Sequence, residues 1–318
     1  MPRPLAAADL VASARAGSPR ALARLISAIE SGHPGLPEVF AALPPGPGAA
    51  HVVGITGAPG AGKSTTTSAL IGAWRARGLS VAVLAVDPSS PFTGGALLGD
   101  RIRMDEHAAD PGVFIRSMAA RGHLGGLAAA TPQAIRLLAA LAYDVILVET
   151  VGVGQSEVEI AGAADTTVVL LAPGMGDGIQ AAKAGILEIA DVFAVNKSDL
   201  PGSHRTVREI RQALNLTVRA DDTGTRPAIV PISALDGTGI AELIAAIDAH
   251  RERAAGTGEL AARRARRARA EIEALVLRAL GERLAPQITT SAADVAAGRM
   301  DPHTAAHAIA EAILARRP

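Results

Sequence analysis

The sequence contains no cysteine. This absence excludes disulfide bonds, cysteine nucleophiles and thiolate metal sites. Acidic and basic residues balance at a formal charge of zero, so the total charge indicates neither nucleic acid nor an anionic membrane as a partner. No apolar run approaches the roughly 20 residues that cross a bilayer, and residues 1–5 lack the apolar stretch of a signal peptide. We therefore expect a soluble, cytoplasmic protein with no nucleic acid and no membrane among its partners.

Lysine is also scarce. Of the 31 lysine and arginine residues only three are lysine, namely Lys63, Lys183 and Lys197. A chain that uses arginine at nearly every basic position is expected to keep lysine where a compact ammonium group does what a planar guanidinium group cannot. Each of these lysines is therefore a candidate functional residue.

Short apolar runs rich in β-branched residues alternate with longer stretches of helical pattern. This alternation predicts an α/β fold with a mostly parallel sheet and helices on both faces. With 318 residues, of which 49% are hydrophobic, the chain can bury a large core. The 24 residues from 88 to 111 suffice for a helical crossover, so the second and third strands should be parallel. The expected strands are residues 51–56, 80–86, 113–116, 144–149, 166–172, 191–196 and 228–232.

Helical extensions flank the predicted sheet. Ser18 and Pro19 predict the start of an amino-terminal helix, and the proline- and glycine-rich residues 43–48 close that segment. After about residue 250 the composition shifts to alanine, arginine, glutamate and leucine, with an apolar stripe at helical spacing that predicts a homodimer. We expect an amino-terminal extension and linker over residues 1–47, the sheet domain over 48–250 and a helical dimerisation arm over 251–318.

Residues 57–64, G-A-P-G-A-G-K-S, fit the phosphate-loop pattern between the first strand and a helix predicted over 65–77. Small residues let backbone N–H groups turn toward a phosphate, and the helix amino terminus adds a positive field. Lys63 can reach the outer phosphates, and the Ser64 hydroxyl is a predicted Mg²⁺ ligand. A structural glycine-rich turn is the alternative. The predicted phosphate-binding residues are Gly57, Ala58, Pro59, Gly60, Ala61, Gly62, Lys63, Ser64 and Thr65.

Residues 196–199, N-K-S-D, end a strand late in the sheet. The Asp199 carboxylate can accept hydrogen bonds from N1–H and the exocyclic amine of guanine, which adenine does not present together. Lys197 is predicted to lie along the base, and Asn196 to brace the loops. Alone, such a tetrapeptide is often a solvated turn, but here it follows a phosphate loop. We therefore predict GTP and GDP as ligands, with Ser233, Ala234 and Leu235 completing the base-binding residues.

Glu149 ends an apolar strand and precedes V-G-V-G-Q, residues 151–155. A carboxylate at this position is predicted to hold Mg²⁺ through the water molecules bound to the ion. Gly152 can offer its N–H to a γ-phosphate because no side chain keeps the backbone away. Gln155 is a candidate for orienting the attacking water, and a polar residue that starts a helix is the alternative. For Glu149 the alternative is a carboxylate that only caps a turn.

Two aspartates lie between the second and third strands. Asp87 ends the second strand beside the phosphate loop and is a candidate second carboxylate near Mg²⁺. Asp100 lies in G-D-R-I-R-M, residues 99–104, and can swing in as part of a first switch. The alternatives are a turn for Asp87 and a helix cap for Asp100.

Two further basic features can also be interpreted as ordinary solvent-exposed residues. Lys183 lies in K-A-G-I-L-E-I-A-D, residues 183–191, where a helix lysine is usually solvated. The arginine-rich run over residues 263–269 is expected to be a solvated helix face and not a nucleic-acid patch, because no aromatic residues accompany it.

Together these motifs resemble the methylmalonyl-CoA mutase-associated GTPases, the MeaB and ArgK group. The matching motifs lie between about residues 54 and 235, and helices of suitable length flank them. The resemblance implies a P-loop GTPase fold of the signal-recognition-particle-like class with helical extensions at both ends. The matching motifs are G-A-P-G-A-G-K-S-T, V-D-P-S-S-P-F-T-G-G, G-D-R-I-R-M, E-T-V-G-V-G-Q-S-E, K-A-G-I-L-E-I-A-D, N-K-S-D and S-A-L.

The resemblance also implies function. Family members are dimeric GTPases that act as chaperones of an adenosylcobalamin-dependent acyl-CoA mutase, gate its cofactor loading and protect it from inactivation. By this resemblance, Asp177 and Lys183 fall in a third switch that relays nucleotide state to the mutase. Gly178 stands where relatives commonly carry a second acidic residue. The catalytic candidates are Lys63, Asp100, Glu149 and Gln155, and the Mg²⁺ candidates are Ser64, Asp87, Asp100 and Glu149.

Two other functional classes are alternatives. A metallochaperone GTPase usually carries histidine-rich or cysteine-bearing segments, whereas here cysteine is absent and the eight histidines are scattered. A small-molecule kinase does not need a guanine-reading loop. The sequence therefore favours a GTPase, and the resemblance implies a mutase as its client.

Overall fold

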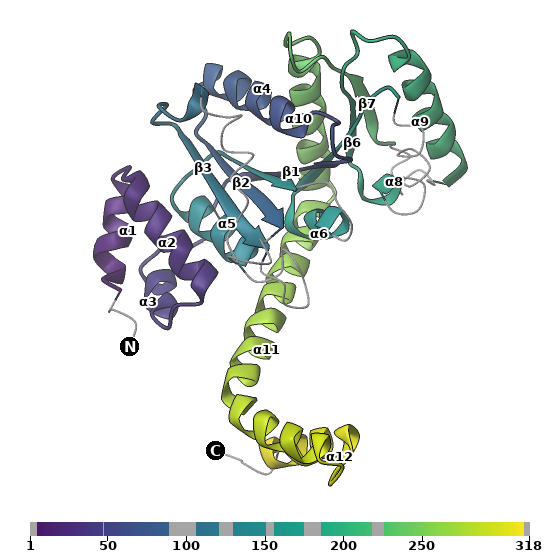
Figure 1. The fold of residues 1–318 in the computed structure, drawn as a ribbon. Coiled ribbons are helices and arrows are strands. Elements are labelled where there is room, and N and C mark those ends of the chain that lie inside the picture. Colours follow the sequence, from purple (N-terminus) through teal and green to yellow (C-terminus); the bar gives the residue numbers. More distant parts are fainter. Residues whose placement is uncertain are drawn as a thin grey trace. The chain divides into compact units, whose positions relative to one another are not determined.

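The computed structural model describes residues 5–46, 48–88, 106–120, 130–150, 156–174, 186–217 and 226–314. These residues form a seven-stranded sheet in the order β3-β2-β4-β1-β5-β6-β7 (Figure 1). Every neighbouring pair in the sheet is parallel. The strands are β1 (His51–Gly57), β2 (Val81–Pro88), β3 (Val113–Ala120), β4 (Val145–Thr150), β5 (Thr166–Leu171), β6 (Val192–Val195) and β7 (Ala228–Pro231).

The strands predicted from the sequence are confirmed, including the parallel pairing of β2 with β3. The largest difference lies in β3, which was expected to end at residue 116 and instead continues to Ala120. Arg116 and Ser117 interrupt the apolar run, but the backbone remains paired with β2 as far as Ala120. Arg116 is accommodated because its guanidinium donates to the side chains of Ser27 and Glu30.

Helices cover both faces of the sheet. Alternate strand residues pack on opposite faces, so that Val52 contributes to one core and Val53 to the other. Helices α4 and α10 pack on the Val53 face, whereas α1, α2, α3, α5 and α6 pack on the Val52 face. The helices are α1 (Ala7–Arg15), α2 (Pro19–Ser31), α3 (Leu36–Ala41), α4 (Lys63–Ala76), α5 (Ala130–Ala140), α6 (Ser156–Ala163), α8 (Ile186–Ile189), α9 (Ser203–Thr217), α10 (Ile240–Gly256), α11 (Glu259–Ala296) and α12 (Pro302–Leu314).

The amino-terminal helices are part of this layered structure. Ser18 caps α2 as predicted, and its side chain accepts a hydrogen bond from the backbone N–H of Ala21 at 3.3 Å. At the other end of α2, Glu30 accepts from the Arg116 guanidinium at 2.5 Å. This contact joins the helical extension to the edge strand β3.

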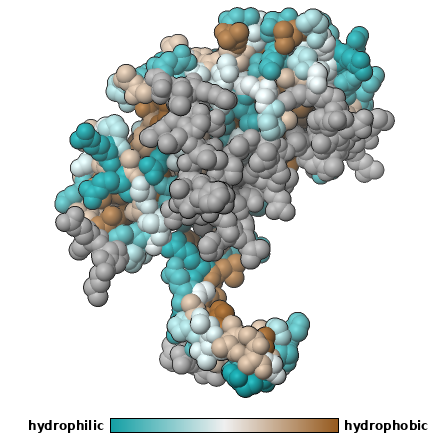
Figure 2. Space-filling view, viewed as in Figure 1, coloured by the Kyte–Doolittle hydropathy of each residue, from teal (hydrophilic) through white to brown (hydrophobic). Residues whose placement is uncertain are grey.

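The chain divides into two compact units, Met1–Ala268 and Arg269–Pro318, with the boundary inside α11. In the second unit, large apolar side chains of α11 remain exposed, and Figure 2 shows apolar surface on these carboxy-terminal helices. None of the helices in the described ranges is long and apolar enough to cross a membrane. The exposed side chains on this part of α11 are Ile272, Leu275, Val276, Leu277, Leu280 and Ile288.

Candidate functional site

The phosphate loop connects the carboxyl end of β1 to the first turn of α4. Gly57 and Gly62 both have positive φ angles, 141° and 92°. A Cβ atom on Gly57 would lie 2.2 Å from the backbone oxygen of Leu170, and one on Gly62 would lie 2.2 Å from Nδ2 of Asn196. Both positions therefore require glycine for backbone conformation and for space.

Lys63 is the first residue of α4 and is buried. Its ammonium group reaches back over the loop, with Nζ donating to the carbonyl oxygens of Gly57 at 2.7 Å and Ala58 at 3.2 Å. The positive charge is therefore held beside the amino terminus of a helix, where backbone N–H groups also attract an anion. This arrangement suits a phosphate group.

Glu149 lies near the carboxyl end of β4, in register with Ile55 of β1 and Ala85 of β2. Its carboxylate is buried, and Oε1 accepts a hydrogen bond from the Ser64 hydroxyl at 2.8 Å. This hydrogen bond holds the Ser64 oxygen beside the carboxylate oxygens of Glu149. A hydroxyl and a carboxylate are hard oxygen ligands, so this pair fits Mg²⁺.

The predicted base loop lies next to the phosphate loop. Asn196 connects the two, because its Nδ2 donates to Ala61 O at 2.8 Å and its Oδ1 accepts from Ala234 N at 3.0 Å. Lys197 adopts a φ of 58° and donates from Nζ to Gly60 O at 3.0 Å. The Asp199 side chain is exposed in the following turn, Ser233 is buried beside Ala234, and Leu235 is exposed.

Several predicted residues fall outside the described part of the chain. The backbone of Asp87 belongs to the carboxyl end of β2, next to β4, but its side chain is not among those described. The assignments that lie wholly outside the described residues are Asp100, Gly152, Gln155, Asp177 and Lys183. They remain predictions.

Two contacts of α4 were missed by the sequence analysis. Thr67 is buried, and its Oγ1 donates to Oε2 of Glu149 at 2.9 Å. On the next residue, the Ser68 hydroxyl contacts the Glu106 carboxylate and lies 3.0 Å from Nε2 of His107. The only local signal was the run of hydroxyl residues S-T-T-T, residues 64–67, after the phosphate-loop lysine.

The arginine-rich run at the start of α11 corrects an expectation. We expected a solvated helix face, but three of its arginines bind the sheet unit. Arg263 donates to both oxygens of Asp191 at 2.7 Å, and Arg264 donates to Oδ2 of Asp165 at 2.7 Å. Arg267 donates to the same carboxylate at 3.4 Å. The expectation failed because the acidic partners lie far away in the sequence, just before β5 and β6.

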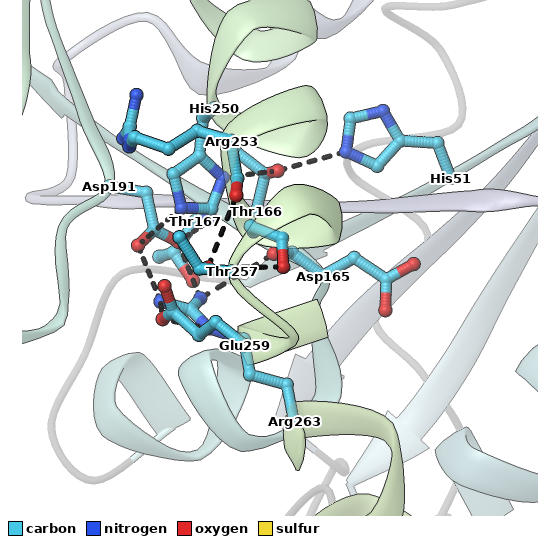
Figure 3. Close-up of polar contacts among 11 residues, drawn as sticks. His51, Asp165, Thr166, Thr167, Asp191, His250, Arg253, Thr257, Glu259 and Arg263 are labelled. Atoms are coloured by element: carbon cyan, nitrogen blue, oxygen red, sulfur yellow. Dashed lines mark hydrogen bonds and ion pairs between the residues drawn. The ribbon is translucent and has the colours of Figure 1, made fainter. Parts of the chain in front are cut away.

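A chain of polar contacts extends from Asp191 across the amino ends of the strands (Figure 3). His250 lies 3.1 Å from Asp191, and the Thr166 hydroxyl lies 2.9 Å from both His250 and His51. Burial, aided by the positive charge of Arg251, lowers the pKa of His51 from 6.5 to about 3. This cluster is at the opposite end of the strands from the phosphate loop, so it serves the structure and not the nucleotide.

Burial opposes ionisation of Asp165 and Asp191, but both carboxyl groups have a pKa below the ordinary value. For Asp165, the hydrogen bond from Arg264 and the charge of Arg267 outweigh burial. For Asp191, the hydrogen bonds from His250 and Arg263 do so. Two buried carboxylates therefore stay charged because arginines of α11 neutralise them.

A parallel sheet, a glycine loop that leads to a buried lysine, and a base loop bound to that glycine loop define a P-loop GTPase. The family model described as methylmalonyl-CoA mutase-associated GTPase MeaB matches residues 22–289. The chain belongs to this family. It is accordingly a GTP-hydrolysing enzyme that binds guanine nucleotides.

Individual relatives agree with this assignment. A putative GTPase of Pyrococcus abyssi is 50% identical over 269 residues, which cover 84% of this chain and 83% of that protein. The GTPase ArgK of Escherichia coli K12 is 40% identical over 248 residues, covering 76% and 74%. A crystal structure described as an LAO/AO transport system kinase has a TM-score of 0.68 at 30% identity and covers 99% of both chains.

Proposed function

We propose that this GTPase is a chaperone of an adenosylcobalamin-dependent acyl-CoA mutase, with methylmalonyl-CoA mutase as the first client to test. The observation that carries this proposal is the match of the mutase-associated GTPase family over residues 22–289. The role assigned to the protein is to gate cofactor loading and to protect the mutase from inactivation. GTP binding and hydrolysis would separate a loading-competent state of the complex from a released state.

The described residues support a nucleotide site in which different residues bind the phosphates, the base and Mg²⁺. Lys63 and the backbone of the phosphate loop would bind the phosphates, and Asp199 would select guanine. Ser64 and Glu149 would hold Mg²⁺, which when bound supplies positive charge to the phosphate oxygens. Asn196 contacts both loops, so it would fix the distance between the base and the phosphates.

The remaining roles are assigned from the sequence. Gly152 would sense the γ-phosphate, Gln155 would orient the attacking water, and Asp100 would enter the site as part of a first switch. Asp177 and Lys183 would form the segment that contacts the mutase. Asp87 would be a second carboxylate near Mg²⁺, a role supported by the position of its backbone at the carboxyl end of β2.

The test is GTP turnover with and without purified methylmalonyl-CoA mutase, together with size-exclusion chromatography of the mixture. We expect turnover to rise and the two proteins to co-elute in the presence of a non-hydrolysable GTP analogue. A Lys63→Ala variant controls for contaminating hydrolases. Unchanged turnover combined with separate elution would reject this mutase as the client.

The fate of the γ-phosphate distinguishes this proposal from a kinase, which is how one matched structure is described. Labelled γ-phosphate should appear as inorganic phosphate when the GTPase is incubated alone or with the mutase. Transfer of label to a small molecule in an extract would support kinase activity instead. For the metallochaperone alternative, calorimetric titration with Ni²⁺ and Zn²⁺ should show no tight, stoichiometric binding.

A further inference from the structure

Two hydroxyl groups of α4 hold the Glu149 carboxylate. The Ser64 hydroxyl donates to Oε1 at 2.8 Å and the Thr67 hydroxyl donates to Oε2 at 2.9 Å. The two donors are three residues apart on one helix, so they project from the same face. Each oxygen of the carboxylate therefore receives a bond from the same rigid element.

This double contact restricts the carboxylate more than either bond alone. The terminal torsion of a glutamate side chain has a broad energy minimum, so one hydrogen bond leaves the carboxylate plane able to rotate. A second donor on the other oxygen fixes that plane. The backbone of Glu149 is fixed as well, because β4 is paired with β1 on one side and β2 on the other.

The Thr67 side chain is buried, so its hydroxyl contacts Glu149 and not solvent. Its relative exposure is 0%, and that of Glu149 is 2%. A hydrogen bond to a charged group at this depth is stronger than one at the surface, and its loss leaves a buried charge without one of its donors. The hydroxyl of Thr67 can therefore influence how Glu149 presents its charge to the adjacent Ser64.

We propose that Thr67 is a positioning residue for GTP hydrolysis, which orients the Glu149 carboxylate toward the Mg²⁺ that Ser64 and Glu149 would hold. It is a positioning residue because it contacts the carboxylate and not the reacting groups. The inference rests on the proposed role of Glu149 in holding Mg²⁺. It adds a residue that supports that role from the interior of α4.

The test uses Thr67→Val, which removes the hydroxyl group at constant shape, and Thr67→Ser, which retains it. For Thr67→Val we expect turnover to fall about tenfold, and the Mg²⁺ concentration that half-saturates the protein–GDP complex in calorimetry to rise by about the same factor. GDP affinity in EDTA should stay within about twofold, because the hydroxyl that is removed donates to Glu149 and not to a phosphate-loop residue. Thr67→Ser should restore both quantities to within about twofold.

Thr66→Val is the matched control. Thr66 is equally buried, but its hydroxyl donates to the backbone oxygen of Gly62 at 2.9 Å. The backbone N–H of Thr66 donates to the same oxygen. This variant should leave the Mg²⁺ dependence unchanged. If valine is not accommodated at position 67, Thr67→Ala removes the same hydroxyl with a smaller side chain.

Combination with Glu149→Gln separates the two levels of the proposal. Thr67→Val should have less than about a twofold effect in the Glu149→Gln background, since the residue acts through that carboxylate. An equal effect in both backgrounds, or a silent Thr67→Val beside an impaired Glu149→Gln, would overturn the inference for Thr67. If Glu149→Gln alone changes neither turnover nor Mg²⁺ binding, the proposed role of Glu149 itself fails.

Discussion

Asp199 determines which base the site accepts, in our proposal, because its carboxylate offers two acceptors in an exposed turn. We predict that Asp199→Ala reduces GTP affinity about a hundredfold or more, since two hydrogen bonds to a charged group are lost. ATP affinity should change by only a few-fold, so the preference for guanine disappears. Calorimetry with both triphosphates measures this. Asp248→Ala, which removes an exposed carboxylate on α10, is the control.

Equal affinities of the unmodified protein for GTP and ATP would contradict the assignment of Asp199. A loss of affinity for both nucleotides in Asp199→Ala would instead indicate that the turn supports the phosphate loop. The contacts of Asn196 and Lys197 with Ala61 O and Gly60 O make the two outcomes distinguishable.

His51 gives the protein a predictable sensitivity to acid. Its pKa is lowered from 6.5 to about 3, so above pH 6.5 the ring is neutral in the folded and unfolded states. Below pH 6.5 the unfolded chain binds a proton that the folded protein does not, and the free energy of unfolding falls. At about pH 5 this residue should lower stability by about 2 kcal/mol relative to neutral pH.

His51→Gln removes this titration while keeping a side chain that can hydrogen-bond to Thr166. We expect the variant to lose less stability between pH 6.5 and about pH 5 than the unmodified protein does, as measured by urea denaturation. His204→Gln, at an exposed position of α9, should retain the original slope. Identical slopes for His51→Gln and the unmodified protein would mean that another group controls the acid response.

The candidate site shows which residues the sequence could reveal. Lys63 and Asn196 lie in short motifs whose order along the chain is itself informative, and Glu149 ends an unbroken apolar strand. Thr67 was missed because its partner lies 82 residues away, and no local pattern distinguishes a threonine that faces a carboxylate from one that faces a backbone oxygen. The contact depends on the register of β4 beside β1, which only the folded chain provides.

At the scale of elements, ion pairs hold the first turns of α11 against the residues that precede β5 and β6. Asp165 is almost fully buried and is neutralised by Arg264 and Arg267. We predict that Arg264→Met, which keeps the apolar stem, lowers the free energy of unfolding by about 2–3 kcal/mol. This value is below the usual cost of breaking a buried pair because Arg267 remains and Arg264 is partly exposed.

Denaturation of Arg264→Met beside Arg266→Met provides the measurement and its control, because Arg266 is exposed on the same turn of α11. Arg266→Met should change stability by less than about 0.5 kcal/mol. Equal effects of the two substitutions would indicate that the ion pairs with Asp165 contribute nothing beyond helix propensity.

The elements themselves were largely predictable. Buried parallel strands are continuous apolar runs, so the hydrophobic pattern and the composition of the sequence located them. The length of the segment from residue 88 to residue 111 indicated a crossover connection between parallel strands. The contacts made by the first turns of α11 were not predictable. Adjacent arginines such as Arg263 and Arg264 also occur on helix faces that point to solvent. The aspartates before β5 and β6 can be recognised as partners of these arginines only in the folded chain, where the amino ends of the strands lie together.

At the scale of the whole molecule, the second unit exposes apolar side chains of α11 that need a covering surface. We predict a homodimer through these helices. Deletion of residues 269–318 should convert the dimer to a monomer in light scattering and leave intrinsic GTP hydrolysis within about twofold, because the deleted unit contains none of the nucleotide-site residues. Val276→Asp in the full chain tests the apolar stripe without removing the unit.

A monomeric full chain, or a deletion variant that still dimerises, would place the interface elsewhere. Deletion from residue 256 onward is a poorer test. It also removes Arg263, Arg264 and Arg267, the arginines that bind the buried Asp165 and Asp191.

The same arginines limit how this protein can exchange parts with its relatives. A recombination event that joins two family members near residue 250 would combine the aspartates of one parent with the helix of the other, and the buried charges would have to match by chance. An exchange point just after Arg267 keeps these arginines together with the two aspartates that they bind. Exchange at this point would replace residues 269–318, while the nucleotide-binding unit is inherited intact with the first turns of α11.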